Sequence, residues 1–462
     1  MNEKIKAANF KIFHRLIHIM VILLAVLIII SCREDGASSS NEDNTNNPND
    51  NNPSTEDIVM YEINFRAFSE SGDFKGVTNK LDHIKSLGVN VIWLMPIHPI
   101  GVKNSVNSPY SVKNYKDVNP EFGSTEDLRN LINESHKKDM SVIIDWVANH
   151  TAWDNPWIAN KDWYTRNAAG DIIIPSGTNW QDVADLNYDD KNMRLAMIDA
   201  MKYWVTEFSI DGFRCDAADF VPYSFWTQAI DTLENIKGRR LILLAEGSRI
   251  DHFTAGFQMN YSWDFFNKLK DVYLNMYSAE NLFTVHAQEY KNIAKGKHKL
   301  RFTTNHDESA WNGTPIELFG GIKSSFSAFV ISTYLGGVPL VYGSQEVGTQ
   351  NKISFFGKNP INWATNPELL KEYQLILSIY KKIDALRKGT LESFPNNDIL
   401  AFKKVSGSEE VLIFVNVRGK SISYELPSAL QNTNWKNELN GETISLKTAL
   451  NFDAFEYFVF TK

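Results

Sequence analysis

Short apolar runs alternate with amphipathic stretches from about residue 57 to about residue 342. The runs are rich in Val, Ile, Leu and Trp, which is typical of parallel strands covered on both faces. Between the first two runs, Val77, Leu81, Ile84 and Leu87 fall on one stripe that stops at Gly88, the pattern of a helix and its C-terminal cap. Eight runs are present, the sixth of them weak: residues 58–65, 89–95, 141–146, 211–215, 241–245, 257–260, 300–304 and 338–342. Eight strand–helix units in one region predict an α/β fold, a closed (β/α)8 or TIM barrel, although the pattern alone also allows an open sheet.

Two segments depart from this alternation. Residues 151–185 are aromatic and rich in Asn and Asp, and they follow the third predicted strand, so we interpret them as a small inserted subdomain. Beyond about residue 390 the pattern changes to alternating strands separated by Gly, Ser and Asn turns. The sequence therefore predicts a catalytic barrel over residues 57–390, which includes the insertion, and a C-terminal β-sandwich over residues 391–462.

The N-terminus has the pattern of an export signal. A basic stretch precedes the apolar run at residues 19–30, which is too short and too close to the N-terminus to favour a membrane anchor. Residues 29–32 resemble a bacterial lipobox, in which the cysteine, here Cys32, is lipidated. We therefore predict a lipoprotein signal peptide over residues 1–32, with a plain transmembrane anchor as the alternative.

Residues 33–56 are mostly Asn, Ser, Asp and Pro, a composition that predicts a disordered tether. Residues 33–35, Arg-Glu-Asp, resemble the acidic tag that directs some lipoproteins to the outer face of the cell. We expect an exported lipoprotein in the bacterial outer membrane that faces either the exterior or the periplasm. Its contact with the membrane would be through the N-terminal lipid anchor only.

Composition excludes several classes of function. Lys and Arg total 47 against 55 Asp and Glu, and a net charge of -8 offers no basic surface for nucleic acid. The only cysteines are Cys32 and Cys215, so no disulfide framework supports the fold. No Cys/His spacing resembles a zinc site and no Gly-rich phosphate loop follows a strand, so we expect no organic cofactor. Aromatic residues make up 12% of the chain, and such rings can stack on the apolar faces of sugars.

Four predicted strands end in carboxylates, where the chemistry of a barrel gathers. Buried acids are unfavourable without partners, so their coincidence favours a function over an incidental charge network. Cleavage of a glycosidic bond with retention needs a carboxylate nucleophile and a protonated carboxyl about 5 Å away. Asp216 and Glu246, which end the fourth and fifth strands, are neighbours that can form such a pair.

The four strand-end segments resemble, in order, the signature regions of the α-amylase superfamily, glycoside hydrolase family 13. The segments are residues 145–150, 211–218, 244–247 and 304–307. The resemblance implies that Asp216 is the nucleophile, Glu246 the general acid/base and Asp307 the third acid, which binds sugar hydroxyls. It also implies that Arg214 keeps Asp216 ionised by lowering its pKa.

Further residues gain roles from the same resemblance. Substrate would be bound by Tyr110, His150 and His306 together with Arg214, while Asp145 would brace the arginine and have a structural role. Asn149 is a calcium ligand in many relatives. However, those relatives carry Lys-His after the nucleophile segment, where this chain has Asp219 and Phe220. Calcium binding is therefore left open.

The resulting hypothesis is a retaining glycoside hydrolase that cleaves α-glucosidic bonds, α-1,4 above all, in starch, maltodextrin or malto-oligosaccharides through a covalent glycosyl-Asp216 intermediate. One alternative is a glucanotransferase or isomerase of the same family. Another is a non-catalytic surface lipoprotein that binds glycan. Partners would be the α-glucan and other glycan-uptake proteins, but not nucleic acid. The sequence does not fix chain-length preference or endo against exo action.

Overall fold

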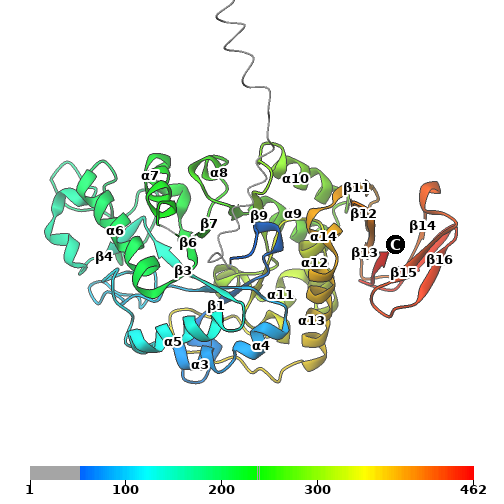
Figure 1. Ribbon diagram of the computed structural model, residues 1–462, viewed down its shortest axis with the longest axis horizontal. Helices are drawn as coiled ribbons and strands as arrows, with labels where there is room; N and C mark the ends of the chain where they lie inside the picture. The colour runs from blue at the N-terminus through cyan, green and yellow to red at the C-terminus, as the bar shows by residue number, and fades with distance from the viewer. Residues whose placement is uncertain (1–51, 237, 239) are drawn as a thin grey trace, which may run out of the picture. The chain divides into compact units, whose positions relative to one another are not determined.

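The computed structural model describes residues 52–236, 238 and 240–462 (Figure 1). The predicted signal peptide, Cys32 and most of the predicted tether lie outside these residues. The described residues begin inside the predicted tether, and residues 52–56 make defined contacts. Asn52 Oδ1 accepts a hydrogen bond of 2.7 Å from Ser141 Oγ, and Thr55–Asp57 form the short 3-10 helix η1. These contacts are polar, so a reading of hydrophobic runs does not detect them. Over the residues described, no helix has both the length and the apolar character needed to span a bilayer.

Eight parallel strands close into a barrel in the order β1-β10-β9-β8-β7-β6-β3-β2. All eight predicted runs form these strands, including the weak sixth run, which is β8. The strands are β1 (Met60–Ile63), β2 (Val91–Leu94), β3 (Ser141–Val147), β6 (Gly212–Asp216), β7 (Ile242–Ala245), β8 (Met259–Tyr261), β9 (His298–Arg301) and β10 (Val338–Tyr342). The predicted TIM barrel is therefore confirmed. Their side chains are almost all buried, as expected when helices cover the outside of a barrel whose interior is filled.

Helices surround the barrel and bury their apolar stripes against it (Figure 1). The predicted helix before Gly88 is two helices, α3 (Phe74–Thr78) and α4 (Leu81–Ser86), and the four stripe residues are all buried. The others are α2 (Phe65–Phe68), α5 (Thr125–His136), α6 (Lys191–Phe208), α7 (Tyr223–Glu234), α8 (Asp251–Ala255), α9 (Trp263–Leu274), α10 (Asn281–Tyr290), α11 (Pro315–Phe319), α12 (Ile322–Tyr334), α13 (Pro367–Lys382) and α14 (Asp384–Lys388). Gly88 has a φ of 79°, so it occupies the left-handed region that ends helices at glycine.

The insertion after β3 is held by a two-stranded antiparallel sheet. Strand β4 (His150–Ala152) pairs with β5 (Val183–Asp185), with His150 opposite Asp185. Two short 3-10 helices, η2 (Pro156–Ala159) and η3 (Lys161–Trp163), lie between the strands. Because β4 follows β3 directly, the insertion begins at the same barrel end as the predicted acids.

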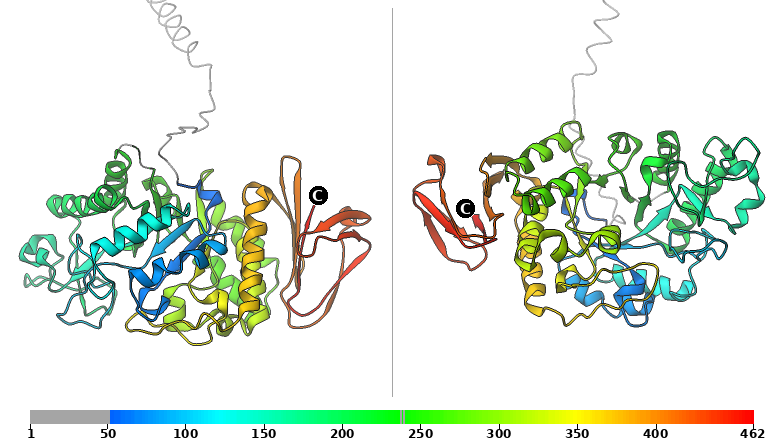
Figure 2. Two further views of the ribbon diagram at one scale, coloured as in Figure 1. Left: turned by 60° about the horizontal axis from the view of Figure 1, so that its bottom comes forward. Right: turned by 180° about the vertical axis from the view of Figure 1, so that it is seen from behind.

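The C-terminal region contains two antiparallel sheets, which both views in Figure 2 place to one side of the barrel. The larger sheet has the order β11-β12-β13-β18-β15-β16 and the smaller one pairs β14 with β17. In β13, Val411, Ile413 and Val415 join the barrel core, whereas Leu412 and Phe414 join a second core under the smaller sheet. Alternate side chains of β13 therefore enter different cores, so both faces of the strand are buried. The strands are β11 (Thr390–Phe394), β12 (Ile399–Ser406), β13 (Glu409–Asn416), β14 (Ile422–Glu425), β15 (Thr433–Asn437), β16 (Thr443–Leu446), β17 (Ala449–Phe452) and β18 (Tyr457–Thr461).

Candidate active site

Arg214 on β6 is the centre of the acid cluster. Its guanidinium Nη1 lies 2.8 Å from Asp145 Oδ1 and 2.8 Å from Asp216 Oδ1, and its Nη2 lies 2.9 Å from Glu246 Oε1. The strand register explains the first contact, because Asp145 on β3 stands directly opposite Arg214 on β6. Glu246 follows β7, the neighbour of β6 on the other side. One cation therefore contacts acids from three adjacent strands. The sequence predicted contacts of Arg214 with Asp145 and Asp216, but not the one with Glu246.

Aromatic rings enclose the guanidinium. Its carbon atom lies 5.0 Å from the ring centroid of Trp93 and 5.7 Å from that of Tyr261, within the range of cation–π attraction. Its Nε donates to Tyr261 Oη at 3.2 Å. Arg214 has no exposed surface, so its charge is balanced by the three acids rather than by water. Trp93 and Tyr261 were not among the predicted site residues, because nothing in an apolar strand marks one buried ring as a neighbour of a charge.

Burial is the largest influence on the pKa values of Asp216 and Glu246. It raises the pKa of both Asp216 and Glu246, and the Arg214 guanidinium opposes that rise. The predicted effect of Arg214 on Asp216 thus has the expected sign, but the net direction is upward because burial outweighs it. Burial raises the pKa of Asp145 to about 7 against the same opposing cation. A raised pKa favours the protonated form of Glu246, the form that a general acid needs.

His306 lies between Asp307 and Glu62, a carboxylate that was not among the predicted site residues. Its Nε2 lies 2.7 Å from Tyr110 Oη and 3.3 Å from Asp307 Oδ2, and its Nδ1 lies 2.5 Å from Glu62 Oε1. Burial acts to lower the imidazole pKa, but Asp307 and Glu62 outweigh it and raise the pKa to about 9. His306 is therefore an imidazolium at neutral pH. The signal for Glu62 was an acid inside the first apolar run, which is unfavourable unless it has a partner.

These acids open into a cavity of about 620 Å³. Its walls include Asp216, Glu246 and Asp307, together with three of the four predicted substrate-binding residues, Tyr110, His150 and His306. The fourth, Arg214, is fully buried and is not among the lining residues. Burial lowers the pKa of His150 to about 4, so this ring is neutral, and Asn149 Nδ2 lies 3.2 Å from its Nδ1. The structure thus brings the predicted acids and ligand-binding residues to one place. Aromatic side chains that were not predicted complete the walls: Trp180, Trp311, Phe355 and Phe356.

Comparison with known proteins agrees with this geometry. The family model described as "Alpha amylase, catalytic domain" matches residues 38–180 and 177–258, the part of the chain that carries Asp145, Arg214, Asp216 and Glu246. These residues amount to a little under half of the chain, and the match supports an α-amylase catalytic domain over them. The chain is an α-amylase-type glycoside hydrolase.

Relatives and solved structures extend the similarity over most of the chain. Alpha-amylase 3 of Dictyoglomus thermophilum is 26% identical over 470 residues, which cover 85% of this chain and 89% of that protein. A cyclomaltodextrin glucanotransferase of Niallia circulans is 27% identical over 86% of this chain but 62% of its own length. The crystal structure of an α-amylase from Lactobacillus plantarum has a TM-score of 0.80 at 26% identity and covers 88% of this chain and 99% of its own.

The surroundings of Asn149 in this amylase domain do not fit a calcium site. Calcium takes six to eight oxygen ligands, several of them carboxylates. Here the Asn149 carbonyl accepts the Leu186 N–H at 3.2 Å, and the neighbouring Ala148 carbonyl accepts the Tyr188 hydroxyl at 2.6 Å. Within the described part of the chain, no three His, Cys, Asp or Glu side chains gather closely enough to hold a metal ion. The predicted ligand role of Asn149 therefore lacks the partners that it would need.

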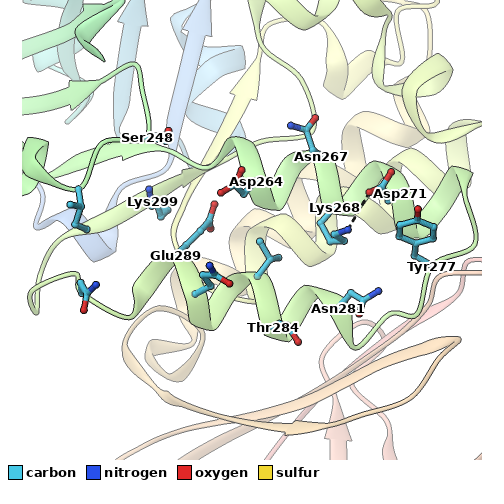
Figure 3. Close-up of a pocket in the computed structure, with 14 residues that line it drawn as sticks. Ser248, Asp264, Asn267, Lys268, Asp271, Tyr277, Asn281, Thr284, Glu289 and Lys299 are labelled. Atoms are coloured by element: carbon cyan, nitrogen blue, oxygen red, sulfur yellow. Dashed lines mark hydrogen bonds and ion pairs between the residues drawn. The ribbon is translucent and has the colours of Figure 1, made fainter. Parts of the chain in front are cut away.

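A larger hollow, of about 720 Å³, lies on the outside of the amylase barrel between α9 and α10. Figure 3 shows its polar lining, including the ion pair between Lys268 Nζ and Asp271 Oδ2 at 3.3 Å. Glu289 in this hollow binds the buried Arg301 at 2.7 Å. Among the described residues, no ion pair joins two acids of this hollow to one cation, so size alone does not identify the active site.

Proposed function

We propose that this enzyme hydrolyses α-1,4-glucosidic bonds in starch, maltodextrin or malto-oligosaccharides by double displacement, with retention at the anomeric carbon. The proposal rests on one observation. Asp216 and Glu246 bind the two terminal nitrogens of one buried arginine, Arg214, and both acids line the same cavity. Binding to one guanidinium keeps the two carboxyls close together, and closely spaced carboxyls favour the retaining route over the inverting one.

Each acid has a defined step in this proposal. An Asp216 oxygen attacks the anomeric carbon while Glu246 gives its proton to the leaving oxygen, so that a glycosyl ester forms as the glucosidic bond breaks. Glu246 then takes a proton from water, whose oxygen attacks the same carbon and releases Asp216. The Ala217 N–H donates to Glu246 Oε2 at 2.7 Å and fixes the orientation of that carboxyl. Asp307 and the His306 imidazolium line the same cavity and would bind hydroxyls of the central sugar.

Two pairs of aromatic rings at the cavity, which we call the aromatic walls, support a substrate of several sugar units. Trp180 of the insertion packs 6.0 Å from Phe220, and Trp311 packs 5.6 Å from Phe356. Trp311 and Phe220 remain 59% and 55% exposed, which leaves ring surface for stacking against sugar. A glucan that crosses the cavity could contact both walls while its central bond meets the acids.

The test compares the purified protein, without its first fifty or so residues, with Asp216→Asn and Glu246→Gln variants on starch. We expect reducing sugar from the parent protein and a loss of at least about 1,000-fold in each variant. Asp231→Asn, an exposed acid on α7, is the matched control and should retain full activity. Proton NMR of the first product should show the α-anomer. Equal rates for the parent and Asp216→Asn, or a β-anomeric first product, would overturn the proposed mechanism.

Transfer to a sugar is the second candidate, because several relatives are named as cyclomaltodextrin glucanotransferases. Both reactions share the glycosyl-Asp216 intermediate and differ in whether water or a sugar hydroxyl resolves it. A time course with maltotriose separates them. Glucose and maltose from the earliest points indicate hydrolysis, whereas early oligosaccharides longer than the substrate indicate transfer. A non-catalytic glycan binder is not favoured, because such a protein would not need a nucleophile and an acid paired on one cation.

We also propose that the enzyme is exported and anchored in the bacterial outer membrane through lipidated Cys32, alongside other proteins of glycan uptake. Support comes from the sequence of residues 1–35, which lie outside the described residues. A Cys32→Ser variant should lose incorporation of labelled palmitate and leave the membrane fraction. Protease treatment of intact cells distinguishes an exterior from a periplasmic position. Palmitate labelling that survives in Cys32→Ser would refute the anchor assignment.

A further inference from the structure

A pocket of about 490 Å³ lies at the end of the barrel opposite the acids. Its lining includes His298, the first residue of β9, and Gly336 and Gly337, which precede β10. All three stand at the amino-terminal ends of their strands, whereas the acids stand at the carboxyl ends. Lys404 on β12 closes the pocket from the C-terminal sheet. The pocket therefore lies between the barrel and the C-terminal region and is separate from the proposed active site.

Lys404 is a buried cation without an acidic partner. Its side chain is 3% exposed, and the hydrogen bond that it makes is to the backbone carbonyl of Leu386. Over the described residues, no carboxylate lies within ion-pair distance, 4.0 Å, of its ammonium. Burial lowers the pKa of Lys404 to about 7. An ammonium in this position leaves N–H groups unsatisfied, which is unfavourable unless an anion supplies the missing acceptors.

Other side chains that line the pocket carry N–H donors. His286 Nδ1 accepts from Arg301 Nη2 at 3.0 Å, which leaves the proton of this neutral ring on Nε2. Arg387 binds Asp57 and Asp384 through its terminal nitrogens, but its buried Nε has no hydrogen-bond partner. Lys295 also lines the pocket and is exposed. Among the lining residues, Glu56 is the sole acid. The lining thus presents several N–H donors from separate elements and little negative charge.

We propose that this pocket binds a phosphate-type oxyanion, either inorganic phosphate or the phosphate group of a small phosphomonoester, with Lys404 as its principal ligand. A tetrahedral oxyanion accepts several charge-assisted hydrogen bonds at once, which matches donors that approach from α10, α14 and β12. Its negative charge balances the ammonium that the protein leaves unpaired. The bound anion also links the barrel to the C-terminal sheet, so it stabilises the folded chain. The inference does not depend on the proposed reaction.

The test is isothermal titration of the protein with inorganic phosphate, with sodium chloride at equal ionic strength as the reference, together with thermal unfolding in both. We expect saturable binding of phosphate and a rise in Tm of a few degrees at saturation. Lys404→Met should weaken binding at least tenfold. Lys403→Met is the matched control, because Lys403 is the next residue on β12 and pairs with Glu392 at 2.9 Å; its binding should be unchanged. Lys295→Ala, at an exposed position, should weaken binding several-fold without altering the fold.

Two further arms identify the ligand and the location. Binding of glucose 1-phosphate at least tenfold tighter than that of phosphate would assign a phosphomonoester, whereas equal affinities would assign the free oxyanion. Asp216→Asn should bind phosphate as the parent protein does, because the pocket is remote from the acids. The proposal is wrong if the parent protein shows no saturable binding, or if Lys404→Met and the parent protein bind phosphate equally.

Discussion

The pair of Glu62 and His306 sets the charge of one wall of the active site, and Glu62→Gln tests its strength. Glu62 Oε1 lies 2.5 Å from His306 Nδ1, and the two side chains are 0% and 1% exposed. Asp307 approaches the other ring nitrogen to 3.3 Å. Burial disfavours the charged ring, yet these two carboxylates outweigh burial and bring the pKa of His306 to about 9. The glutamine variant keeps an oxygen that can accept from Nδ1 but removes the charge.

The size of the effect follows from the pKa of His306. The interval between the ordinary value of 6.5 and about 9 corresponds to about 3 kcal/mol in favour of the imidazolium in the folded protein. Because the folded-state pKa lies above the unfolded one, this stabilisation is complete below pH 6.5 and is lost as the pH rises through about 9. Asp307 remains in the variant and is the stronger of the two raising charges. We therefore expect Glu62→Gln to lower the pKa of His306 from about 9 toward its ordinary value and to remove about 1 to 3 kcal/mol of the preference for the imidazolium.

The assay is a pH titration of the protein with isotope-labelled histidine, followed by NMR, with the His306 signal assigned by its loss in His306→Gln. Glu126→Gln, an exposed acid on α5, is the control and should leave the titration in place. Loss of the imidazolium in Glu62→Gln should also raise KM near pH 8, where the parent protein still carries the charge. The reasoning is refuted if His306 in the variant still titrates near 9, or if the parent residue titrates at or below 6.5.

Three further predictions concern the arginine, the aromatic wall and the calcium question. Arg214→Lys should lower kcat/KM at least about 100-fold, because a single ammonium cannot hold three buried acids. The control, Arg166→Lys at an exposed ion pair, should change kcat/KM less than about twofold. Trp311→Ala should lower kcat/KM about tenfold on oligosaccharides long enough to reach the ring. It should shift Tm little, because the ring is 59% exposed. Equal loss on maltose and on long chains would contradict a stacking role. Excess chelator should leave both activity and Tm unchanged, because the backbone carbonyl of Asn149 is engaged by the protein; a fall in Tm that added calcium reverses would reject this.

The sequence predicts most of the fold because the barrel strands are continuous apolar runs, and such a signal depends on local residues alone. Even the short β8, Met259–Tyr261, overlaps the weak run predicted at residues 257–260. The apolar stripe before Gly88 predicted the buried residues but not the break between α3 and α4. A stripe of buried positions continues smoothly across Asn79 and Lys80, although the helix stops and restarts there, because both halves face the same core. Burial pattern thus predicts which residues face inward more reliably than where the backbone hydrogen bonds break.

Some residues of the candidate site could likewise be predicted from local sequence, and others could not. Asp145, Arg214, Asp216 and Glu246 were accessible from the sequence because each lies at or near the carboxyl end of a strand, and parallel register then brings these ends together. The His306–Glu62 contact joins residues 244 positions apart, at opposite ends of the barrel sequence. Only closure of the sheet, with β1 beside β10 and β10 beside β9, brings them within reach. A local pattern marks Glu62 as an anomaly in an apolar strand but does not name its partner, so the electrostatics of this wall depends on the closed barrel rather than on any one segment.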